Sequence, residues 1–274
     1  MAAHGDNTLS VGIAGLGAIG GVVAAALAAG IPGLALAAVA ARDRAKAETW
    51  LASRRIAAEI ATLSALAASC DIVVECLPPA RFAEIAEAVV DAGKILVPLS
   101  VGMLLAHPDL GERAWATGAR ILVPTGALIG LDAVRAAAEG KIHSVRMVTR
   151  KPPKGLAGAP YLVANNISLD GLTAPLKVFE GSARDGAKGF PANVNVAAAL
   201  SLAGIGPDLT RLEIWADPGV ERNMHAIEVD AQSARFSMSI ENIPSTENPR
   251  TGQITGLSVV ALLRRLGAPL VVGS

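Results

Sequence analysis

The stretch Leu9-Ser-Val-Gly-Ile-Ala-Gly-Leu-Gly-Ala-Ile-Gly20 decides the fold, because it places Gly15, Gly17 and Gly20 between an apolar strand and an alanine-rich helix. In a turn of this kind Gly15 permits the tight bend, Gly17 lets the backbone approach a pyrophosphate, and Gly20 lets the helix pack closely on the strand. The first helical residues, Ala18 and Ile19, would then hold the anion with their N–H groups. The pattern favours a dinucleotide-binding turn, and the alternative is an ordinary strand-to-helix turn that binds nothing.

The composition indicates a packed protein of two domains rather than a disordered chain. The 274 residues are 52% hydrophobic, which is ample material for a core, and this length fits two lobes of ordinary size. Basic and acidic residues number 24 each, so the formal net charge is zero. No overall field then attracts nucleic acid or an anionic membrane, and we expect neither as a partner.

Other features of the sequence favour the cytoplasm. The first residues lack the basic start and the apolar stretch of a secretory signal, and no uninterrupted apolar segment is long enough to span a bilayer. Cys70 and Cys76 flank an apolar run, which suits reduced, packed thiols better than a disulfide framework or a metal site. We therefore expect a reducing compartment and no bound metal.

Short apolar runs alternate with helical patterns in the first half of the chain, which is typical of β-α-β units and a parallel sheet. The apolar runs lack strict alternation, as expected when both faces of a sheet are covered. The sequence therefore predicts an α/β Rossmann dinucleotide-binding domain over residues 1–124. The predicted strands are Ser10–Ala14, Leu34–Ala40, Ile72–Cys76, Ile95–Pro98 and Ile121–Val123, and the predicted helices are Ile19–Ala29, Arg44–Arg54, Arg81–Asp91 and Leu110–Thr117.

The pattern changes after Pro124. Alternating apolar and polar residues indicate antiparallel strands with one covered face, so we expect a second, α+β domain with a mostly antiparallel sheet over residues 125–245. The last segment, residues 246–274, contains a predicted helix at Thr251–Leu266 whose apolar face packs back on the first domain. The other predicted elements are the helices Leu131–Glu139 and Val194–Ala203, the strands His143–Thr149, Leu209–Ala216, His225–Ala231 and Ala234–Ile240, and a loop at Lys151–Pro160.

The residues after the second predicted strand bear on the choice of cofactor. In dinucleotide folds an acidic residue at this place binds the adenosine ribose hydroxyls and repels a 2′-phosphate. Asp43 fits that role and favours NAD, whereas Arg42 and Arg44 could pair with the extra phosphate of NADP. The alternative is that all three are solvated residues at the start of a helix. The sequence leaves both NAD and NADP open.

Three loops follow strands at the carboxyl edge of the predicted sheet, where ligands bind in folds of this class. They are Glu75–Pro79, Leu99–Gly102 and Pro124–Gly130. Their prolines stiffen the chain and their glycines permit close approach of the backbone to a ring, so these loops could line a nicotinamide. The alternative is that they are only turns between elements.

His225 is the candidate acid–base residue. It follows the polar turn Asp217–Asn223 and begins an apolar predicted strand, so its ring could project from a rigid edge. Imidazole titrates near neutral pH, which suits proton transfer in a redox reaction at a carbon that bears oxygen or nitrogen. The alternative is a structural histidine. The other histidines, His4, His107 and His143, lie in a predicted disordered end, in a loop and at the start of a strand.

Seven segments, taken in order, carry a family resemblance. Together they resemble the L-aspartate dehydrogenases of the NadX type along nearly the whole length of the chain. Each segment is moderately specific, and their order and spacing are highly specific. The segments are Gly15-Leu-Gly-Ala-Ile-Gly20, Leu99-Ser-Val-Gly102, Pro124-Thr-Gly-Ala-Leu-Ile-Gly-Leu-Asp132, Arg150-Lys-Pro-Pro153, Gly189-Phe-Pro-Ala-Asn-Val-Asn-Val-Ala-Ala-Ala-Leu-Ser-Leu-Ala203, Arg222-Asn-Met-His225 and Glu241-Asn-Ile-Pro-Ser-Thr-Glu-Asn-Pro-Arg250.

The resemblance implies the reversible oxidative deamination of L-aspartate with NAD or NADP, which gives iminoaspartate and then oxaloacetate plus ammonia. It also implies a place in NAD biosynthesis and a homodimer or a larger symmetric homo-oligomer. On the family's motifs the active-site histidine falls on His225, and a cofactor-contacting alanine falls on Ala127. A cofactor-contacting asparagine falls on Asn195, with Asn193 as the alternative.

A substrate with two carboxylates requires hydrogen-bond donors. The candidates are Thr125, Lys151, Asn193 and Arg222. Thr125 stands where a serine is common in the family, a change that keeps the hydroxyl. The alternative interpretation of Lys151 and Arg222 is that they are ordinary charged residues at the surface.

Two other functions stay open from the sequence. Two-domain dehydrogenases that act on homoserine, and reductases of dihydrodipicolinate, share the glycine-rich turn and an α+β second domain, and the fold alone does not separate them. The chain lacks their basic catalytic motifs and has the run Arg222–His225 instead. The non-enzymatic alternative is a protein that binds NAD without turnover, and it predicts no spectral change with any amino acid.

Overall fold

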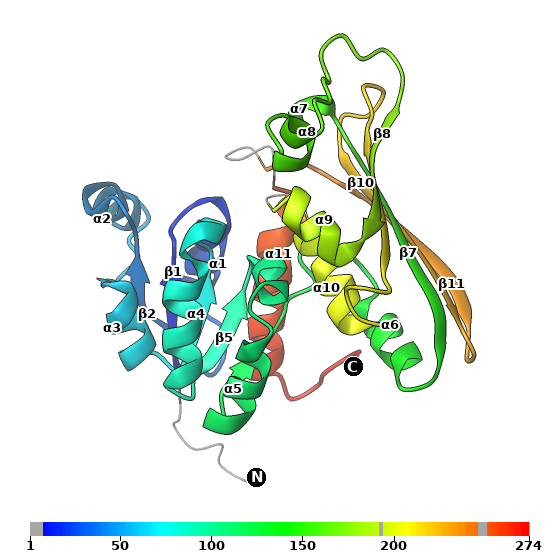
Figure 1. Cartoon of the computed structure of the whole chain (residues 1–274). Coiled ribbons are helices and arrows are strands. Elements are labelled where there is room, and N and C mark those ends of the chain that lie inside the picture. Colours follow the sequence, from blue (N-terminus) through cyan, green and yellow to red (C-terminus); the bar gives the residue numbers. More distant parts are fainter. Residues whose placement is uncertain (1–7, 192–193, 246–250, 274) are drawn as a thin grey trace. The chain divides into compact units, whose positions relative to one another are not determined.

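The computed structural model describes residues 8–191, 194–245 and 251–273 of the chain. Internal contacts divide the chain into two units. The first unit holds the chain up to Ser100 together with His107–Pro124 and Gly256–Val271, and the second holds Val101–Ala106, Thr125–Thr255 and the last residues. Each unit is built on its own sheet (Figure 1).

The first unit contains a six-stranded sheet in the order β3-β2-β1-β4-β5-β6, with every pair parallel. This is the strand order of a dinucleotide-binding Rossmann fold, as predicted. Strand β3 was not predicted, because a strand of two residues shows no periodic pattern. The strands are β1 (Leu9–Ala14), β2 (Leu34–Ala40), β3 (Glu59–Ile60), β4 (Ile72–Glu75), β5 (Ile95–Pro98) and β6 (Arg120–Ile121).

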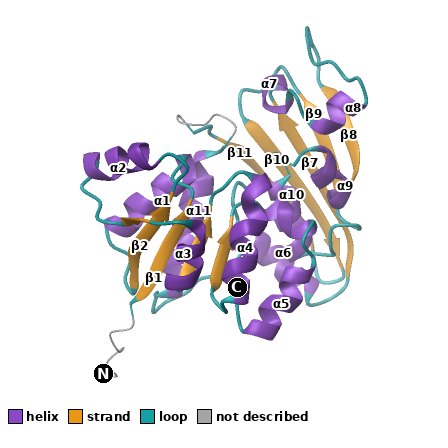
Figure 2. Ribbon diagram, turned by 60° about the vertical axis from the view of Figure 1, so that its left-hand side comes forward, coloured by secondary structure: helices purple, strands orange, loops and turns teal. Residues whose placement is uncertain are grey.

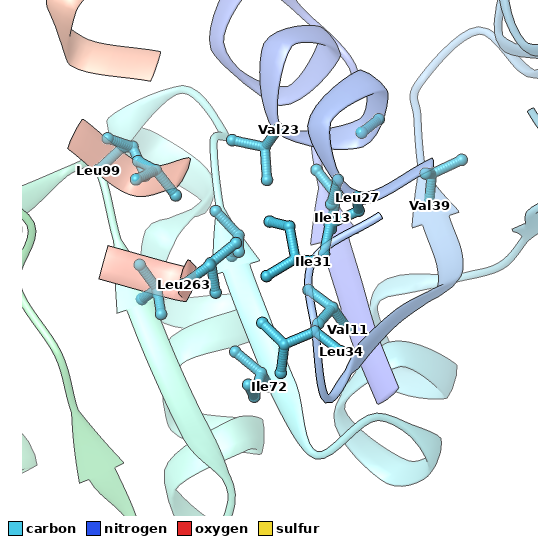
Figure 3. Packing of buried hydrophobic residues seen from close by; sticks show 14 of the residues in the cluster. Val11, Ile13, Val23, Leu27, Ile31, Leu34, Val39, Ile72, Leu99 and Leu263 are labelled. Atoms are coloured by element: carbon cyan, nitrogen blue, oxygen red, sulfur yellow. The ribbon is translucent and has the colours of Figure 1, made fainter. Parts of the chain in front are cut away.

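The core of the first unit lies between one face of this sheet and two helices that are far apart in the sequence (Figure 3). Helix α1 contributes Val23 and Leu27, and helix α11 contributes Val259 and Leu263. These side chains pack on the apolar residues of β1 and its neighbours, so most of α11 is part of the first unit. The helices are α1 (Ala18–Ala28), α2 (Arg44–Ser53), α3 (Leu63–Ser69), α4 (Phe82–Asp91), α5 (Asp109–Thr117) and α11 (Gln253–Leu266), with a 3-10 helix η1 (Pro79–Arg81).

Helix α3 covers the opposite face of the sheet and was not predicted from the sequence. A Cβ at Gly12 would lie 2.8 Å from Sγ of Cys70 and 2.9 Å from Cδ2 of Leu66, so a glycine in β1 lets α3 pack directly on the strand. Oγ1 of Thr62 accepts a hydrogen bond of 3.2 Å from the N–H of Ala65 and sets the start of the helix.

Cys70 and Cys76 are both free thiols, as predicted.

The second unit contains a five-stranded sheet in the order β11-β10-β7-β9-β8. Three of its pairings are antiparallel, and β7 pairs with β9 in parallel. The sheet is therefore mixed, with the antiparallel majority that the alternating segments predict. Strand β8 was missed, and its register shifts between Lys177 and Phe179, which breaks the alternation. The strands are β7 (Ile142–Lys151), β8 (Leu176–Ser182), β9 (Arg211–Ala216), β10 (Asn223–Ala231) and β11 (Arg235–Asn242).

Helices α6, α9 and α10 gather on one face of this second sheet (Figure 2). A Cβ at Gly186 in α9 would lie 2.5 Å from Cδ2 of Leu212 in β9, so glycine permits the close approach of helix and sheet. The opposite face carries ion pairs such as that of Arg146 with Glu213 at 2.7 Å. The predicted loop at Lys151–Pro160 contains a short helix instead. The helical elements are η2 (Val101–Leu105), α6 (Leu131–Ala138), α7 (Pro153–Leu156), α8 (Pro160–Ala164), α9 (Ala183–Gly189) and α10 (Asn195–Ala203).

Candidate functional site

Two of the three glycines in the first turn are required by the protein's own packing. Gly15 has a φ of +105°, a region that side chains disfavour, and its Cβ would lie 2.6 Å from the carbonyl oxygen of Cys76. A Cβ at Gly20 would lie 2.0 Å from the carbonyl oxygen of Gly15. The turn between β1 and α1 could not close with any larger residue at these two positions.

Gly17 is different, because nothing inside the protein requires it to be a glycine. Its φ of −91° and ψ of −162° are open to other residues, and a Cβ there would meet no atom within 4 Å. It lies at the N-cap of α1, next to Ala18 and Ile19, where backbone N–H groups are free to bind an anion. The open space in front of Gly17 therefore fits a pyrophosphate that approaches the backbone closely.

A pocket of about 360 Å³ opens beside the carboxyl end of β2. Its lining includes Ala40, Arg42 and Arg44 from the end of β2 and the start of α2, and Arg81 from η1. The structure thus brings the predicted Arg42 to a cavity in the first unit. Asp43 instead caps α2, because its Oδ1 accepts a 3.0 Å hydrogen bond from the N–H of Lys46.

Glu75 connects two of the predicted loops, and its side chain was not among the predicted site residues. The carboxylate is fully buried at the end of β4. Its oxygens accept hydrogen bonds from the N–H of Leu77 at 2.8 Å and of Ser100 at 2.9 Å, and from the Ser100 hydroxyl at 3.0 Å. Burial raises the pKa of Glu75, and these hydrogen bonds oppose that effect. The sequence signal that could have pointed to this residue is a glutamate at the end of an otherwise apolar strand.

Asn195 and Ala127 each take part in a side-chain-to-backbone hydrogen bond within the second unit. Oδ1 of Asn195, the first residue of α10, accepts a 3.0 Å hydrogen bond from the N–H of Gly102. The amide of Asn242 donates to the carbonyl oxygen of Ala127 at 3.1 Å. Asn242 is buried, and it was not predicted as a site residue although it lies in the last segment of the family resemblance. Asn193, the alternative to Asn195, lies outside the described residues.

His225 lies on β10, two residues after its first residue, and this strand is central rather than at a sheet edge. Nδ1 of the ring is 3.0 Å from Oγ1 of Thr149, its partner residue on β7. Only 3% of His225 is exposed. Burial, with a smaller contribution from the charge of Lys151, lowers the pKa of His225 from 6.5 to about 3. Burial therefore favours the neutral imidazole at neutral pH, against the expectation of a ring that titrates there.

Lys151 ends β7 two residues after Thr149, so both side chains lie on the same face of the sheet. That face also carries His225, because His225 is paired directly with Thr149. Lys151 is 6% exposed, and burial lowers its pKa from 10.5 to about 8. The alternative of an ordinary exposed lysine is wrong. We call Thr149, Lys151 and His225 the buried polar cluster.

Thr125 and Arg222 lie at the surface. Thr125 is exposed in the turn before α6, where its carbonyl oxygen accepts a 3.2 Å hydrogen bond from the N–H of Leu128. The Arg222 side chain is 51% exposed and lies 3.8 Å from the Glu241 carboxylate. For Arg222 the structure agrees with the alternative of an exposed charge. Thr125 and Arg222 stay candidates for binding the substrate carboxylates only through the family resemblance.

Two kinds of site are missing from the part of the chain that the structure describes. Over residues 8–191, 194–245 and 251–273, no group of three or more His, Cys, Asp or Glu side chains is placed to hold a metal ion. Over the same ranges, no helix combines the length and the apolarity that a membrane crossing requires.

The chain is similar to known proteins over both units. Residues 132–266 match the family model "Aspartate dehydrogenase, C-terminal", and residues 15–124 match "Homoserine dehydrogenase, NAD binding domain". The chain is 60% identical to the L-aspartate dehydrogenase of Bradyrhizobium diazoefficiens, over 98% of this chain and 95% of that protein. It is 55% identical to L-aspartate dehydrogenase 3 of Bordetella bronchiseptica, over 97% of this chain and 98% of that protein. The crystal structure of aspartate dehydrogenase from Thermotoga maritima, at 24% identity, shares the fold with a TM-score of 0.70 over 97% of this chain and 99% of that one.

Proposed function

The chain belongs to the L-aspartate dehydrogenase family, and on this premise we propose that it catalyses the reversible oxidative deamination of L-aspartate with NAD or NADP. The products are iminoaspartate and then, after addition of water, oxaloacetate and ammonia. The single observation that supports this most strongly is the buried polar cluster, because it offers an imidazole and an amine on one face of the second sheet. The reaction needs both a proton acceptor and a cation for a dicarboxylate.

The first unit would bind the dinucleotide. Gly17 and the N–H groups of Ala18 and Ile19 would hold the pyrophosphate at the start of α1, in a turn that Gly15 and Gly20 allow to close. When bound, the nicotinamide supplies the acceptor for the hydride from Cα of aspartate. Among the cofactor contacts that the resemblance implies, the carbonyl of Ala127 and the Oδ1 of Asn195 are each held by one hydrogen bond. Asn242 and Gly102 therefore orient these two residues.

His225 would take or relay the proton of the substrate amine. Aspartate arrives as an ammonium ion, and the amine must lose a proton before the C=N bond forms at Cα. The His225 ring is neutral, so one ring nitrogen can accept that proton, and Thr149 can set which one by accepting from Nδ1–H. The carboxylates of a bound substrate raise the pKa of the ring, because negative charge favours the protonated imidazole. The same ring can then return a proton as water adds to the imine and ammonia leaves.

Lys151 would bind a substrate carboxylate. Its ammonium group is costly to bury, and burial lowers its pKa to about 8. A carboxylate beside it favours the charged form and raises the pKa again. Thr125, Asn193 and Arg222 are the further candidates for the substrate carboxylates, and they rest on the resemblance alone.

The setting of the enzyme follows from the family. We infer that it works in the cytoplasm, feeds NAD biosynthesis and forms a homodimer or a larger homo-oligomer. Size-exclusion chromatography with light scattering measures the number of subunits directly.

The test of the proposed function is a comparison of substrates. The full chain is mixed with NAD or NADP and either L-aspartate or L-homoserine, and the absorbance of the reduced nicotinamide is followed. We expect reduction with L-aspartate only. Turnover of L-homoserine without turnover of L-aspartate would assign the chain to the alternative dehydrogenase, and no reduction with either amino acid would favour binding without catalysis.

A further inference from the structure

We propose that the pocket beside the carboxyl end of β2 holds the 2′-phosphate of NADP, with Arg42 as its anchor, so that this chain binds NADP more tightly than NAD. The inference rests on the proposed function only in requiring that a dinucleotide binds at the turn between β1 and α1. Family membership does not decide the preference between NAD and NADP, and the sequence left both cofactors open.

The end of β2 lacks the carboxylate that NAD recognition uses. In a fold of this class an acidic residue at the end of the second strand accepts hydrogen bonds from the adenosine ribose hydroxyls and repels a phosphate on the 2′-oxygen. Here β2 ends at Ala40, which is followed by Ala41. Both residues line the pocket, and neither has a polar side chain. Small apolar side chains at this place leave space for a phosphate and present nothing that repels it.

The nearest acidic residue, Asp43, is engaged elsewhere. One oxygen of its carboxylate accepts a 3.0 Å hydrogen bond from the N–H of Lys46, as the N-cap of α2. The other oxygen lies 3.8 Å from Nζ of the same lysine. Asp43 is also missing from the residues that line the pocket. Its carboxylate therefore stabilises the start of α2 rather than binding the ribose.

Three arginines, Arg42, Arg44 and Arg81, are among the residues that line the pocket, whose other walls are mostly apolar. The lining contains a single acidic residue, Glu84. Both oxygens of Glu84 accept hydrogen bonds from Arg81, at 2.7 to 3.0 Å. Glu84 is therefore neutralised within the wall of the pocket and is a poor acceptor for ribose hydroxyls.

Arg42 is the guanidinium that stays available for an anion. Nε of Arg44 donates to Glu48 at 3.0 Å, and Arg81 is bound to Glu84. Over residues 8–191, 194–245 and 251–273, no carboxylate forms an ion pair with Arg42. A guanidinium matches two phosphate oxygens with parallel hydrogen bonds, which a ribose hydroxyl cannot reproduce. Charge-assisted bonds of this kind correspond to about a tenfold or larger difference in affinity.

The experiment measures binding without substrate. Isothermal titration calorimetry of the full chain gives dissociation constants for NADP⁺ and NAD⁺, and for the fragments 2′,5′-ADP and 5′-AMP. We expect NADP⁺ to bind at least about tenfold more tightly than NAD⁺, with the same order for the two fragments. Arg42→Ala removes most of that difference and leaves the affinity for NAD⁺ within about twofold. Arg120→Ala, an exposed arginine on β6 that does not line the pocket, leaves both affinities unchanged.

Three results would overturn the inference. Equal or tighter binding of NAD⁺ by the wild type contradicts the preference, and equal weakening of both dinucleotides in Arg42→Ala contradicts the role of this residue. Both results leave the proposed function intact, because a dinucleotide still binds. Failure of both dinucleotides to bind would overturn the inference together with the proposed function.

Discussion

Nδ1 of His225 and Oγ1 of Thr149 lie 3.0 Å apart across the antiparallel pairing of β10 with β7. Both residues are buried, so neither polar atom can exchange this partner for water without cost. The hydroxyl can donate to the ring or accept from it, and this choice decides which ring nitrogen carries the proton. Thr149 is therefore a positioning residue for the imidazole.

Thr149→Val should lower kcat for L-aspartate about tenfold or more, because the ring loses the partner that sets its tautomer and orientation. The substitution keeps the shape of the side chain and leaves a buried ring nitrogen without its hydrogen bond. Steady-state kinetics together with the Kd of the dinucleotide measure the effect, and we expect the Kd to be unchanged. Thr149→Ser restores the hydroxyl and should recover most of the rate. Equal loss in both variants would show that only packing matters at this position.

Gly17→Ala should weaken dinucleotide binding about tenfold or more without unfolding the protein. A methyl group there meets no protein atom within 4 Å, so it takes space that the pyrophosphate needs and little else. Gly20→Ala is the matched comparison, because its Cβ would lie 2.0 Å from the Gly15 carbonyl oxygen and should destabilise the fold. Thermal unfolding and calorimetric titration separate the two effects. An unchanged dinucleotide Kd in Gly17→Ala would exclude the turn as the binding site.

Lys151→Met should make the protein more stable at neutral pH and remove part of its pH dependence. Burial lowers the pKa of Lys151 from 10.5 to about 8, so between these values the unfolded chain binds more protons at this residue than the folded chain. The free energy of unfolding of the wild type therefore rises with pH across this window, by at most about 3 kcal/mol from this group. Urea unfolding of wild type and variant at several pH values measures it. Lys154→Met changes an exposed lysine and is the control, so its free energy of unfolding should vary with pH as that of the wild type does. If the pH dependence of Lys151→Met is also the same as that of the wild type, the lowered pKa of Lys151 is refuted.

Glu75→Gln should destabilise the protein by about 1–3 kcal/mol. The NH₂ group of glutamine would face N–H or O–H groups that now donate hydrogen bonds to the carboxylate, so some of these bonds would be lost. Those donors belong to the loops that follow β4 and β5. The matched control is Glu84→Gln, whose side chain is 52% exposed and should change stability little. Chemical unfolding of both variants gives the comparison. Equal effects would mean that the buried carboxylate does not fasten the loops.

Much of the fold could be predicted because it depends on local sequence signals. The glycine spacing and the apolar runs predicted β1, β2, β4, β5 and β6 and their parallel direction, and the resemblance predicted the family, which the relatives confirm. The elements that were missed are short or irregular. Strand β3 has two residues, α3 has seven, and β8 has a register shift. None of these gives a clear period along the chain.

The candidate site was harder to predict, because burial and pairing across the sheet are tertiary properties. The sequence singled out His225 and Lys151 separately, and only the pairing of β10 with β7 places them with Thr149 on one face. The pKa of His225 depends on that burial and could not be read from a residue type. Glu75 and Asn242 act through partners that are distant in sequence, so no local pattern pointed to their contacts.

The role of His225 can be measured most directly by comparing the wild type with His225→Ala in the aspartate-dependent reduction of the nicotinamide, with dinucleotide affinity determined on the same samples. Loss of a proton-transfer residue lowers kcat by roughly 10²- to 10⁴-fold. We expect a fall in this range with the dinucleotide Kd unchanged. A variant that oxidises L-aspartate at the wild-type rate would contradict the assignment and leave His225 as a structural residue of the second sheet.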